Sequence, residues 1–184
     1  MGAVGLIILL FLEVIIVGVF VCIYWSDSTS WRYGAPYIPV SRNLIQQVLS
    51  FGNIRQDDVF YDLGSGDSRI LLAAVRLFKV RKAVGYEAAT WPYLKSKFLI
   101  RAAGLEKKIT VFRENFFGAD IREATFIYMY LFPGTVDKLA KKIATECQPG
   151  VRVLSLRFPI GNQKFRLLDS RKINRMTAYL YGKI

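Results

Sequence analysis

A short apolar run that ends in an acid and a glycine-rich turn constrains this chain more than any other feature. Val59–Tyr61 is typical of a buried strand, Asp62 closes it, and the turn Gly64-Ser65-Gly66 follows. Ile70–Val75 then opens an apolar, helical segment. Glycine allows a sharp reversal and the close approach of a ligand, and a helix start offers unpaired N–H groups. The stretch therefore predicts a cradle for a nucleotide-type cofactor.

The remaining residues of the turn distinguish between cofactors. A dinucleotide fingerprint needs a third glycine for close helix–strand packing, and Arg69 stands in that place. The whole string, Asp62-Leu63-Gly64-Ser65-Gly66-Asp67-Ser68-Arg69, resembles the first motif of class I S-adenosylmethionine (AdoMet) methyltransferases. AdoMet carries no phosphate but has a carboxylate, an ammonium and a sulfonium, so acids at both ends of the turn suit it better than they suit a dinucleotide.

Strand-like and helix-like segments alternate through the rest of the chain. We expect strands at 58–62, 83–87, 109–112, 125–130 and 151–156, and helices at 68–79, 91–103 and 135–146. Such alternation predicts a parallel sheet with helices on both faces. Two further strands, 164–169 and 175–182, joined by a polar turn at 170–172, predict a terminal antiparallel hairpin. The fold class is therefore α/β, and the methyltransferase resemblance implies a Rossmann-like sheet of seven strands.

Polar residues after the second and third strands are candidates for holding the cofactor. Glu87 lies 23 positions after Gly64, near the distance of about 20 expected for an acid that accepts hydrogen bonds from ribose hydroxyls. The alternative is an exposed acid at a helix start. Asn115 offers an amide for the adenine edge, and the neighbouring Phe116 offers a ring for its face. Together with Asp62 and the turn Gly64-Ser65-Gly66, these residues form the predicted cofactor site.

The fourth strand predicts where the methyl group leaves. Carboxyl ends of strands line the ligand crevice of an open α/β sheet, which places Tyr130 and Phe132 at the exit. The chain has no histidine, so Asp67, Tyr130 and water are the candidates that assist proton loss from an acceptor amine. We expect Tyr130 and Phe132 to position that amine by cation–π attraction. Tyr128 points to the same side of the strand as Tyr130. The alternative is that both tyrosines are core residues with satisfied hydroxyls, and of the two we expect Tyr130 rather than Tyr128 to be functional.

A narrower resemblance rests on motifs in the same order along residues 36–160. They are Pro36-Tyr37-Ile38-Pro39, the glycine turn, Glu87, Asn115-Phe116-Phe117, Tyr130-Leu131-Phe132-Pro133 and Pro149–Val153. This set is similar to the small protein-lysine methyltransferases, which include a broad-specificity archaeal enzyme and membrane-anchored mitochondrial relatives. The resemblance implies AdoMet contacts by Asp62, Gly64, Gly66, Glu87 and Asn115, and a protein lysine as acceptor. Ser68 and Ala88-Ala89 depart from the family pattern, and we expect Ser68 to cap the helix that follows it.

The N-terminal segment predicts a single membrane anchor. Ala3–Trp25 holds 23 residues with one charge, Glu13. As a helix it would be about 34 Å long, enough for a hydrocarbon core of about 30 Å. Arginines follow the span and none precedes it, so the positive-inside rule places the body on the cytoplasmic or organellar-interior side. We therefore divide the chain into an anchor (1–25), a linker and lead-in segment (26–40) and a methyltransferase domain (41–184) whose first helix begins after Ser41.

Charge limits the partners without selecting one. The formal net charge is +12, which suits nucleic acid, anionic lipid or an acidic protein face. Without histidine, and with Cys22 and Cys147 far apart, the chain has no metal-ligand pattern. Eight basic residues and one acid lie between Val151 and Ile184. One hypothesis places this basic tail at a membrane surface, where the acceptor would be a lysine of an integral membrane protein; the other makes it a solvated face.

Two further function classes stay open. A nucleic-acid or small-molecule methyltransferase would use the basic charge, although amino-methylating nucleic-acid enzymes commonly carry Asn/Asp-Pro-Pro-Tyr where this chain has Tyr130-Leu131-Phe132-Pro133. Little sequence is left for a separate target-recognition domain, which makes nucleic acid the less favoured partner. The third class is a non-catalytic, AdoMet-binding membrane module.

Overall fold

The computed structural model describes residues 2–32 and 40–184. The helices are α1 (Ala3–Arg32), α2 (Arg42–Phe51), α3 (Arg69–Phe78), α4 (Thr90–Ala102) and α5 (Pro133–Glu146). The strands are β1 (Val59–Leu63), β2 (Lys82–Tyr86), β3 (Ile109–Phe112), β4 (Phe126–Met129), β5 (Arg152–Leu156), β6 (Phe165–Ile173) and β7 (Met176–Lys183). The motif Pro36-Tyr37-Ile38-Pro39 lies outside the described residues.

The strands form one seven-stranded sheet in the order β3-β2-β1-β4-β5-β7-β6. The first five strands are parallel, and β7 pairs antiparallel with both β5 and β6. The strand order reverses between β1 and β4, and a ligand crevice forms at such a point in an open α/β sheet. The predicted α/β class I sheet with its terminal hairpin is therefore confirmed.

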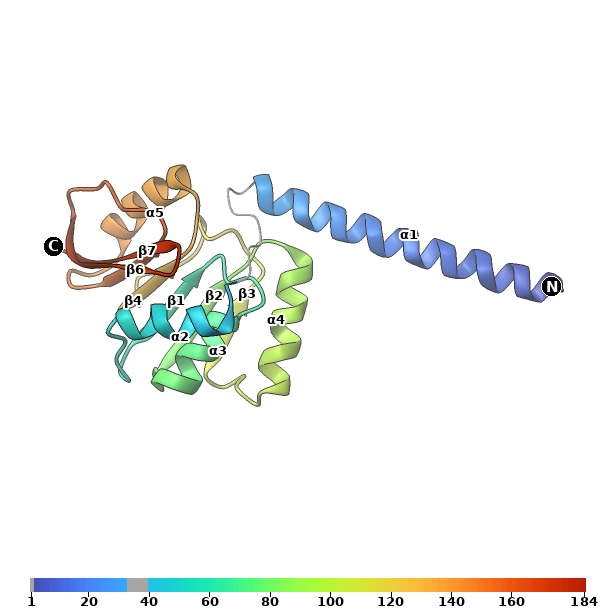
Figure 1. Ribbon diagram of the computed structural model, residues 1–184, viewed down its shortest axis with the longest axis horizontal. Helices are drawn as coiled ribbons and strands as arrows, with labels where there is room; N and C mark the ends of the chain where they lie inside the picture. Colours follow the sequence, from blue (N-terminus) through green and yellow to red (C-terminus); the bar gives the residue numbers. More distant parts are fainter. Residues whose placement is uncertain (1, 33–39) are drawn as a thin grey trace.

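Helices lie on both faces of the sheet (Figure 1), and an apolar layer fills the space on each face. On one face α2, α3 and the inner side of α4 pack against alternate residues of the central strands, among them Phe60, Phe126 and Leu154. On the other face α5 and the segment after β3 pack against Tyr61, Ile127 and their neighbours. The central strands β1 and β4 are buried along their whole length, as expected for parallel strands covered on both faces.

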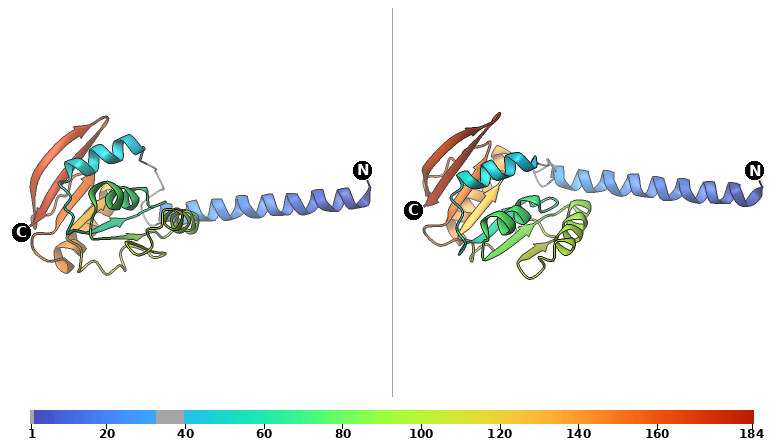
Figure 2. Two further views of the ribbon diagram at one scale, coloured as in Figure 1. Left: turned by 90° about the horizontal axis from the view of Figure 1, so that it is seen from below. Right: turned by 60° about the horizontal axis from the view of Figure 1, so that its bottom comes forward.

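The helix α1 projects away from this body (Figures 1 and 2). Its window Val4–Val21 is exposed along its whole length and is long and apolar enough to cross a membrane. The helix continues to Arg32 rather than ending at Trp25. The polar sequence that we assigned to a linker therefore begins as helix, because no proline or glycine interrupts residues 26–32.

The C-terminal hairpin differs from the prediction in its turn. Residues 170–172 lie within β6, and the reversal falls at Asn174-Arg175. Asn174 has a φ of 55°, and asparagine tolerates this left-handed conformation better than most residues. The hairpin forms the edge of the sheet opposite to β3, whereas α1 contacts α4 on the β3 side. The structure therefore does not place the basic tail beside the helix that we expected to anchor the protein.

Candidate active site

The glycine turn lies at the carboxyl end of β1, as the sequence predicted. Gly64 and Gly66 have φ values of 93° and 53°, which favour glycine. The N–H groups of Gly64 and Ser65 both donate to the Tyr86 carbonyl oxygen of β2, at 2.9 and 3.0 Å. A Cβ on Gly64 would lie 3.3 Å from Leu131 Cδ2. The turn is thus hydrogen-bonded to β2, and Gly64 faces Leu131 in the loop after β4.

Glu87, directly after β2, holds the turn from the other side. Its Oε2 accepts a hydrogen bond from the Gly66 N–H at 2.8 Å, and its Oε1 accepts one from the Ala89 N–H at 2.7 Å. The side chain is buried. Burial raises the pKa of the Glu87 carboxyl, and these backbone N–H groups oppose that rise. Each oxygen keeps a second lone pair, so the carboxylate can still accept bonds from the two ribose hydroxyls.

Asp62 is a buried carboxylate at the end of β1. Burial, and then the charges of Glu87 and Asp67, hold the pKa of the Asp62 carboxyl well above its ordinary value of 3.8. A cationic ligand would offset both effects. AdoMet carries two positive groups, so this cluster of acids fits the cofactor that the sequence predicted.

Asp67 is committed to two cations. Arg69 donates to both of its oxygens, from Nε at 2.8 Å and from Nη2 at 2.7 Å, and Lys95 Nζ lies 2.9 Å from Oδ2. Arg69 also donates to the Val40 carbonyl oxygen at 2.9 Å. These contacts join the turn to α4 and to the start of α2. In this arrangement Asp67 is better suited to holding the turn than to accepting a proton, because both of its oxygens are already bonded to these cations.

Ser68 does not cap α3, contrary to the expectation from the sequence. It adopts a left-handed conformation with a φ of 62°, and its hydroxyl lies 2.5 Å from Ser96 Oγ of α4. An N-cap residue normally has an extended backbone, so this conformation points the hydroxyl away from the first turn of α3. A φ of 62° is a conformation that glycine adopts more readily than serine.

The residues after β3 meet the turn across the crevice. Phe116 is buried, and its Cε1 would lie 3.9 Å from a Cβ on Gly64. Phe117 packs edge-on against it, with ring centroids 4.9 Å apart. Asn115 Oδ1 accepts a hydrogen bond from the Phe117 N–H at 3.0 Å, which leaves the Asn115 NH₂ group to donate elsewhere. Asn115 and Phe116 therefore lie where an amide donor and an aromatic wall would meet the cofactor.

The fourth strand brings its tyrosines to the same level as Asp62. Tyr128 pairs in register with Asp62, and burial followed by the Asp62 charge raises the pKa of the Tyr128 hydroxyl. Tyr128 and Tyr130 pack on one face of the sheet, while Ile127 and Met129 pack on the other. Tyr130 is partly buried, and Phe132, just before α5, is 39% exposed. The exit residues thus lie between the core and solvent.

Two buried hydroxyls in this region support the presence of a ligand. Within the described residues, Ser65 Oγ and Tyr128 Oη make no hydrogen bond. A buried polar atom without a partner costs free energy, and a polar ligand that reaches either hydroxyl would offset that cost. The acids and these hydroxyls together fit AdoMet.

Two residues that support the site were not predicted from the sequence. Gly85 lies next to the turn, where a Cβ would come within 2.7 Å of Ser65 Oγ, and Lys95 reaches Asp67 from α4. Leu131, which contacts the turn at Gly64, belongs to the predicted exit loop. The glycine within a strand pattern was a signal of close backbone approach, but nothing local pointed to Lys95.

Comparison with known proteins identifies the family. The family described as the ANTKMT methyltransferase domain matches residues 62–166. This chain belongs to it. A protein-lysine N-methyltransferase of Saccharolobus islandicus is 36% identical over 149 residues, covering 79% of this chain and 92% of that protein. The adenine nucleotide translocase lysine N-methyltransferase of mouse is 32% identical, over 80% of this chain and 64% of that protein.

Solved structures agree on the fold. An RNA methyltransferase from Salinibacter ruber in complex with S-adenosyl-L-homocysteine superimposes with a TM-score of 0.74 at 28% identity, covering 79% of this chain and 94% of that one. The tRNA methyltransferase TrmK of Bacillus subtilis, at 18% identity and a TM-score of 0.65 over 80% and 67% of the two chains, shares the fold alone. The chain is an AdoMet-dependent methyltransferase.

Proposed function

We propose that this enzyme transfers the methyl group of AdoMet to the side-chain amine of a protein lysine, while α1 holds it in a membrane. The observation that carries the proposal is the match to the archaeal protein-lysine N-methyltransferase, which spans nearly the whole of that protein. The site supports it, since aromatic side chains rather than acids lie where the methyl group is predicted to leave the cofactor. A cationic amine is attracted to such rings, and Tyr130 and Phe132 take that positioning role.

The site residues divide the work between binding and alignment. AdoMet supplies an activated methyl group, so the protein mainly has to align the amine with it. Asp62, Gly64, Ser65, Gly66, Glu87, Asn115 and Phe116 hold the donor in the proposal. Asp67 holds the turn through Arg69 and Lys95. The amine must lose a proton before it reacts, because a lysine amine has a pKa of about 10.4, and water at the open exit accepts it.

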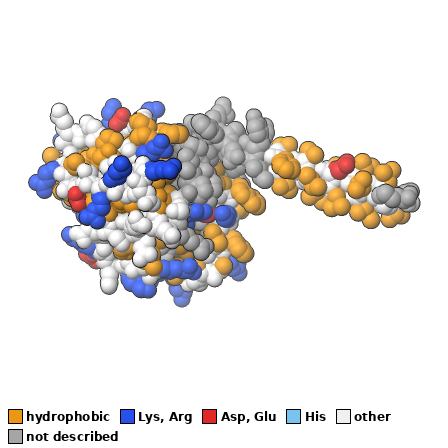
Figure 3. Space-filling model, viewed as in Figure 1, with side chains coloured by type: hydrophobic (Ala, Val, Ile, Leu, Met, Phe, Trp, Pro, Cys, Tyr) orange, Lys and Arg blue, Asp and Glu red, His pale blue; other side chains and the backbone are white. Residues whose placement is uncertain are grey.

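Membrane attachment is the second part of the proposal. The exposed window Val4–Val21 supports it by length and composition, and Figure 3 shows hydrophobic side chains along this helix with one acid among them. The arginines that follow the span favour a body on the cytoplasmic or organellar-interior side. Protein expressed at full length should stay with membranes through carbonate extraction; its appearance in the soluble fraction would contradict an anchor.

The acceptor is tested by transfer of label. Membranes from cells lacking the enzyme are incubated with the full-length protein and AdoMet labelled at the methyl group. We expect label in protein, on lysine after hydrolysis, and none with Glu87→Ala at the same concentration. Label that resists protease and disappears with ribonuclease would establish the competing RNA methyltransferase, which the net charge of +12 and the Salinibacter structure favour.

A further inference from the structure

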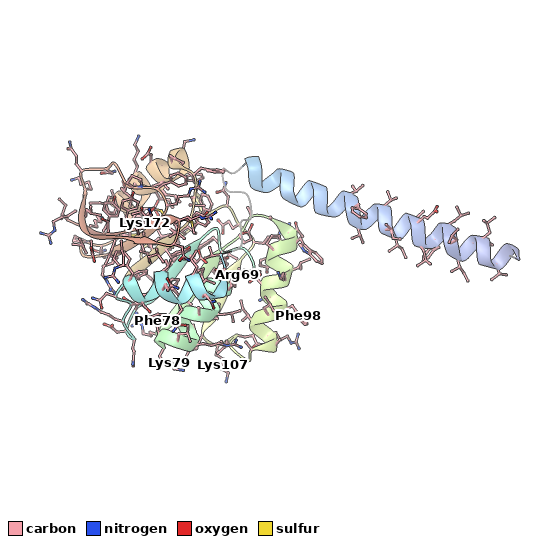
Figure 4. The ribbon with its side chains drawn as sticks, viewed as in Figure 1. Arg69, Phe78, Lys79, Phe98, Lys107 and Lys172 are labelled. Carbon is pink, nitrogen blue, oxygen red and sulfur yellow. The ribbon has the colours of Figure 1, made fainter. Side chains whose placement is uncertain are left out.

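The outer side of α4 exposes three large apolar side chains. Trp91, Leu94 and Phe98 are 58%, 53% and 71% exposed. Their spacing of three and four residues places them on one side of the helix, opposite the buried Pro92, Ser96 and Ile100. We call these three exposed residues the outer face of α4. Figure 4 shows Phe98 on the side of α4 that points away from the sheet.

Basic residues flank this face. Lys97 and Arg101 lie three and seven residues after Leu94, so they border the outer face on one side, and both are exposed. Lys95 borders it on the other side. The sequence of α4 contains no acid. An apolar stripe edged by Lys and Arg is the pattern of a helix that lies in a membrane interface, whereas a docking site for a basic lysine-bearing segment would be expected to carry acids.

The position of α4 relative to α1 favours a lipid surface as the occupant. The two helices are in contact, and α4 runs across the direction of α1 at the side of the body where α1 joins it (Figures 1 and 2). If α1 crosses a bilayer, α4 therefore lies along the bilayer surface. From Trp25 to Arg32 the helix rises about 10 Å, slightly more than a headgroup layer of roughly 5–8 Å. Large side chains on the outer face would reach that layer.

The same helix is joined directly to the cofactor site. Its N-cap Ala89 donates to Glu87 Oε1 at 2.7 Å, and Lys95 lies 2.9 Å from Asp67 Oδ2. The arrowheads of the parallel strands also point toward the side where α1 joins the body (Figure 2). Contact of α4 with the bilayer would therefore set the height and orientation of the crevice above the lipid.

We propose that the outer face of α4 inserts into the headgroup layer of an anionic membrane and presents the crevice to lysines close to that surface. The proposal rests on the proposed anchoring by α1. It assigns the membrane contact to α4 rather than to the C-terminal hairpin, which forms the opposite edge of the sheet.

The test uses the full-length protein in vesicles with an environment-sensitive fluorophore at position 98. Cys22→Ser removes one native thiol, and burial raises the pKa of the other, Cys147, to about 11, so a label reacts at Phe98→Cys. Lys172→Cys, on the opposite edge of the sheet, is the matched control. In phosphatidylcholine vesicles containing phosphatidylglycerol, we expect the label at 98 to be shielded from aqueous iodide and the label at 172 to be quenched freely.

Charge reversal provides the second arm. Lys97→Glu with Arg101→Glu should lower the equilibrium constant for insertion of α4 into the interface by about thirtyfold or more. Each basic residue near an anionic surface contributes a similar attraction, and both are lost. The label at 98 should then become accessible to iodide, while AdoMet affinity shows that the fold is intact. If the protein floats with vesicles but iodide quenches the labels at 98 and 172 equally, α1 anchors the protein and α4 does not contact the membrane. The outer face of α4 would then be a contact surface for another protein. Loss of flotation would overturn the anchoring and this proposal together.

Discussion

The two halves of the crevice are held in different ways. At the carboxyl ends of β1 and β2, Glu87 is bonded to two backbone N–H groups and Asp67 to two cations. At the carboxyl end of β4, Tyr130 and Phe132 are partly open to solvent, and Phe132 lies at the start of α5. The half that we propose to hold the methyl donor (the donor half) is therefore preorganised by directional bonds. The half that we propose to receive the amine (the acceptor half) is an open aromatic surface. Substitutions in the first half should change AdoMet affinity, and those in the second should change turnover.

The largest effect is expected for Glu87→Ala. It removes the proposed acceptors for both ribose hydroxyls and leaves the Gly66 and Ala89 N–H groups without this partner. At about 1–3 kcal/mol for a buried group left unpaired, AdoMet should bind on the order of 100-fold more weakly by calorimetry. Glu123→Ala, which removes an exposed acid, is the control and should bind normally. Equal affinities for the two variants would place the ribose elsewhere.

A somewhat smaller effect is expected for Gly64→Ala. The φ of 93° strains any residue with a Cβ, and the new methyl would lie 3.3 Å from Leu131 Cδ2. The strain costs about 1–2 kcal/mol. If it arises only when AdoMet is bound, binding should be roughly tenfold weaker; if it is already present in the free protein, the melting temperature should be lower. Gly134→Ala, in α5 with open space around it, should leave both quantities nearly unchanged.

The pH dependence of AdoMet binding tests the acid cluster of the donor half. The pKa of Asp62 is raised in the folded protein. The protonated carboxyl therefore contributes to folding stability below the pKa of the unfolded chain, and this contribution is lost as the pH rises through the pKa of the folded state. A bound cation favours the ionised form, so AdoMet affinity should rise with pH through the same range, by up to about tenfold per pH unit. Calorimetry in buffers of different ionisation enthalpy should detect proton release. Asp62→Asn should abolish both the release and the slope.

The donor half could be predicted from the sequence because its signals are local. Asp62, the glycines and Glu87 lie at the ends of strands that are recognisable as apolar runs, and the parallel arrangement brings these strand ends together. The alternation of such runs with helical segments also predicted the order of strands and helices. The ion pair of Lys95 with Asp67 escaped prediction, since it depends on how α4 packs beside the turn.

The errors have physical causes in elements without a local signal. The strand β6 is exposed over Arg166–Lys172, so no alternation distinguishes its polar residues from a turn, and only its pairing with β7 reveals the strand. Ser68 reads as a cap, yet its φ of 62° is set by the reversal of the chain around the turn. The end of α1 was misplaced because polar residues were taken to end a helix that carries no breaker.

The smallest effect is expected for Tyr130→Phe, and it separates positioning from proton transfer in the acceptor half. The ring is what attracts a cationic amine, and Phe keeps it, so kcat/KM should fall by less than about threefold. Tyr130→Ala removes the ring and should lower kcat/KM by about tenfold, for a cation–π contribution of roughly 1–2 kcal/mol. AdoMet affinity should be unaffected in both, because Tyr130 lies beyond the donor-binding residues. If Tyr130→Phe instead lost turnover as fully as Tyr130→Ala, the hydroxyl would be taking part in proton removal, and the acceptor half would depend on a directional bond like the donor half.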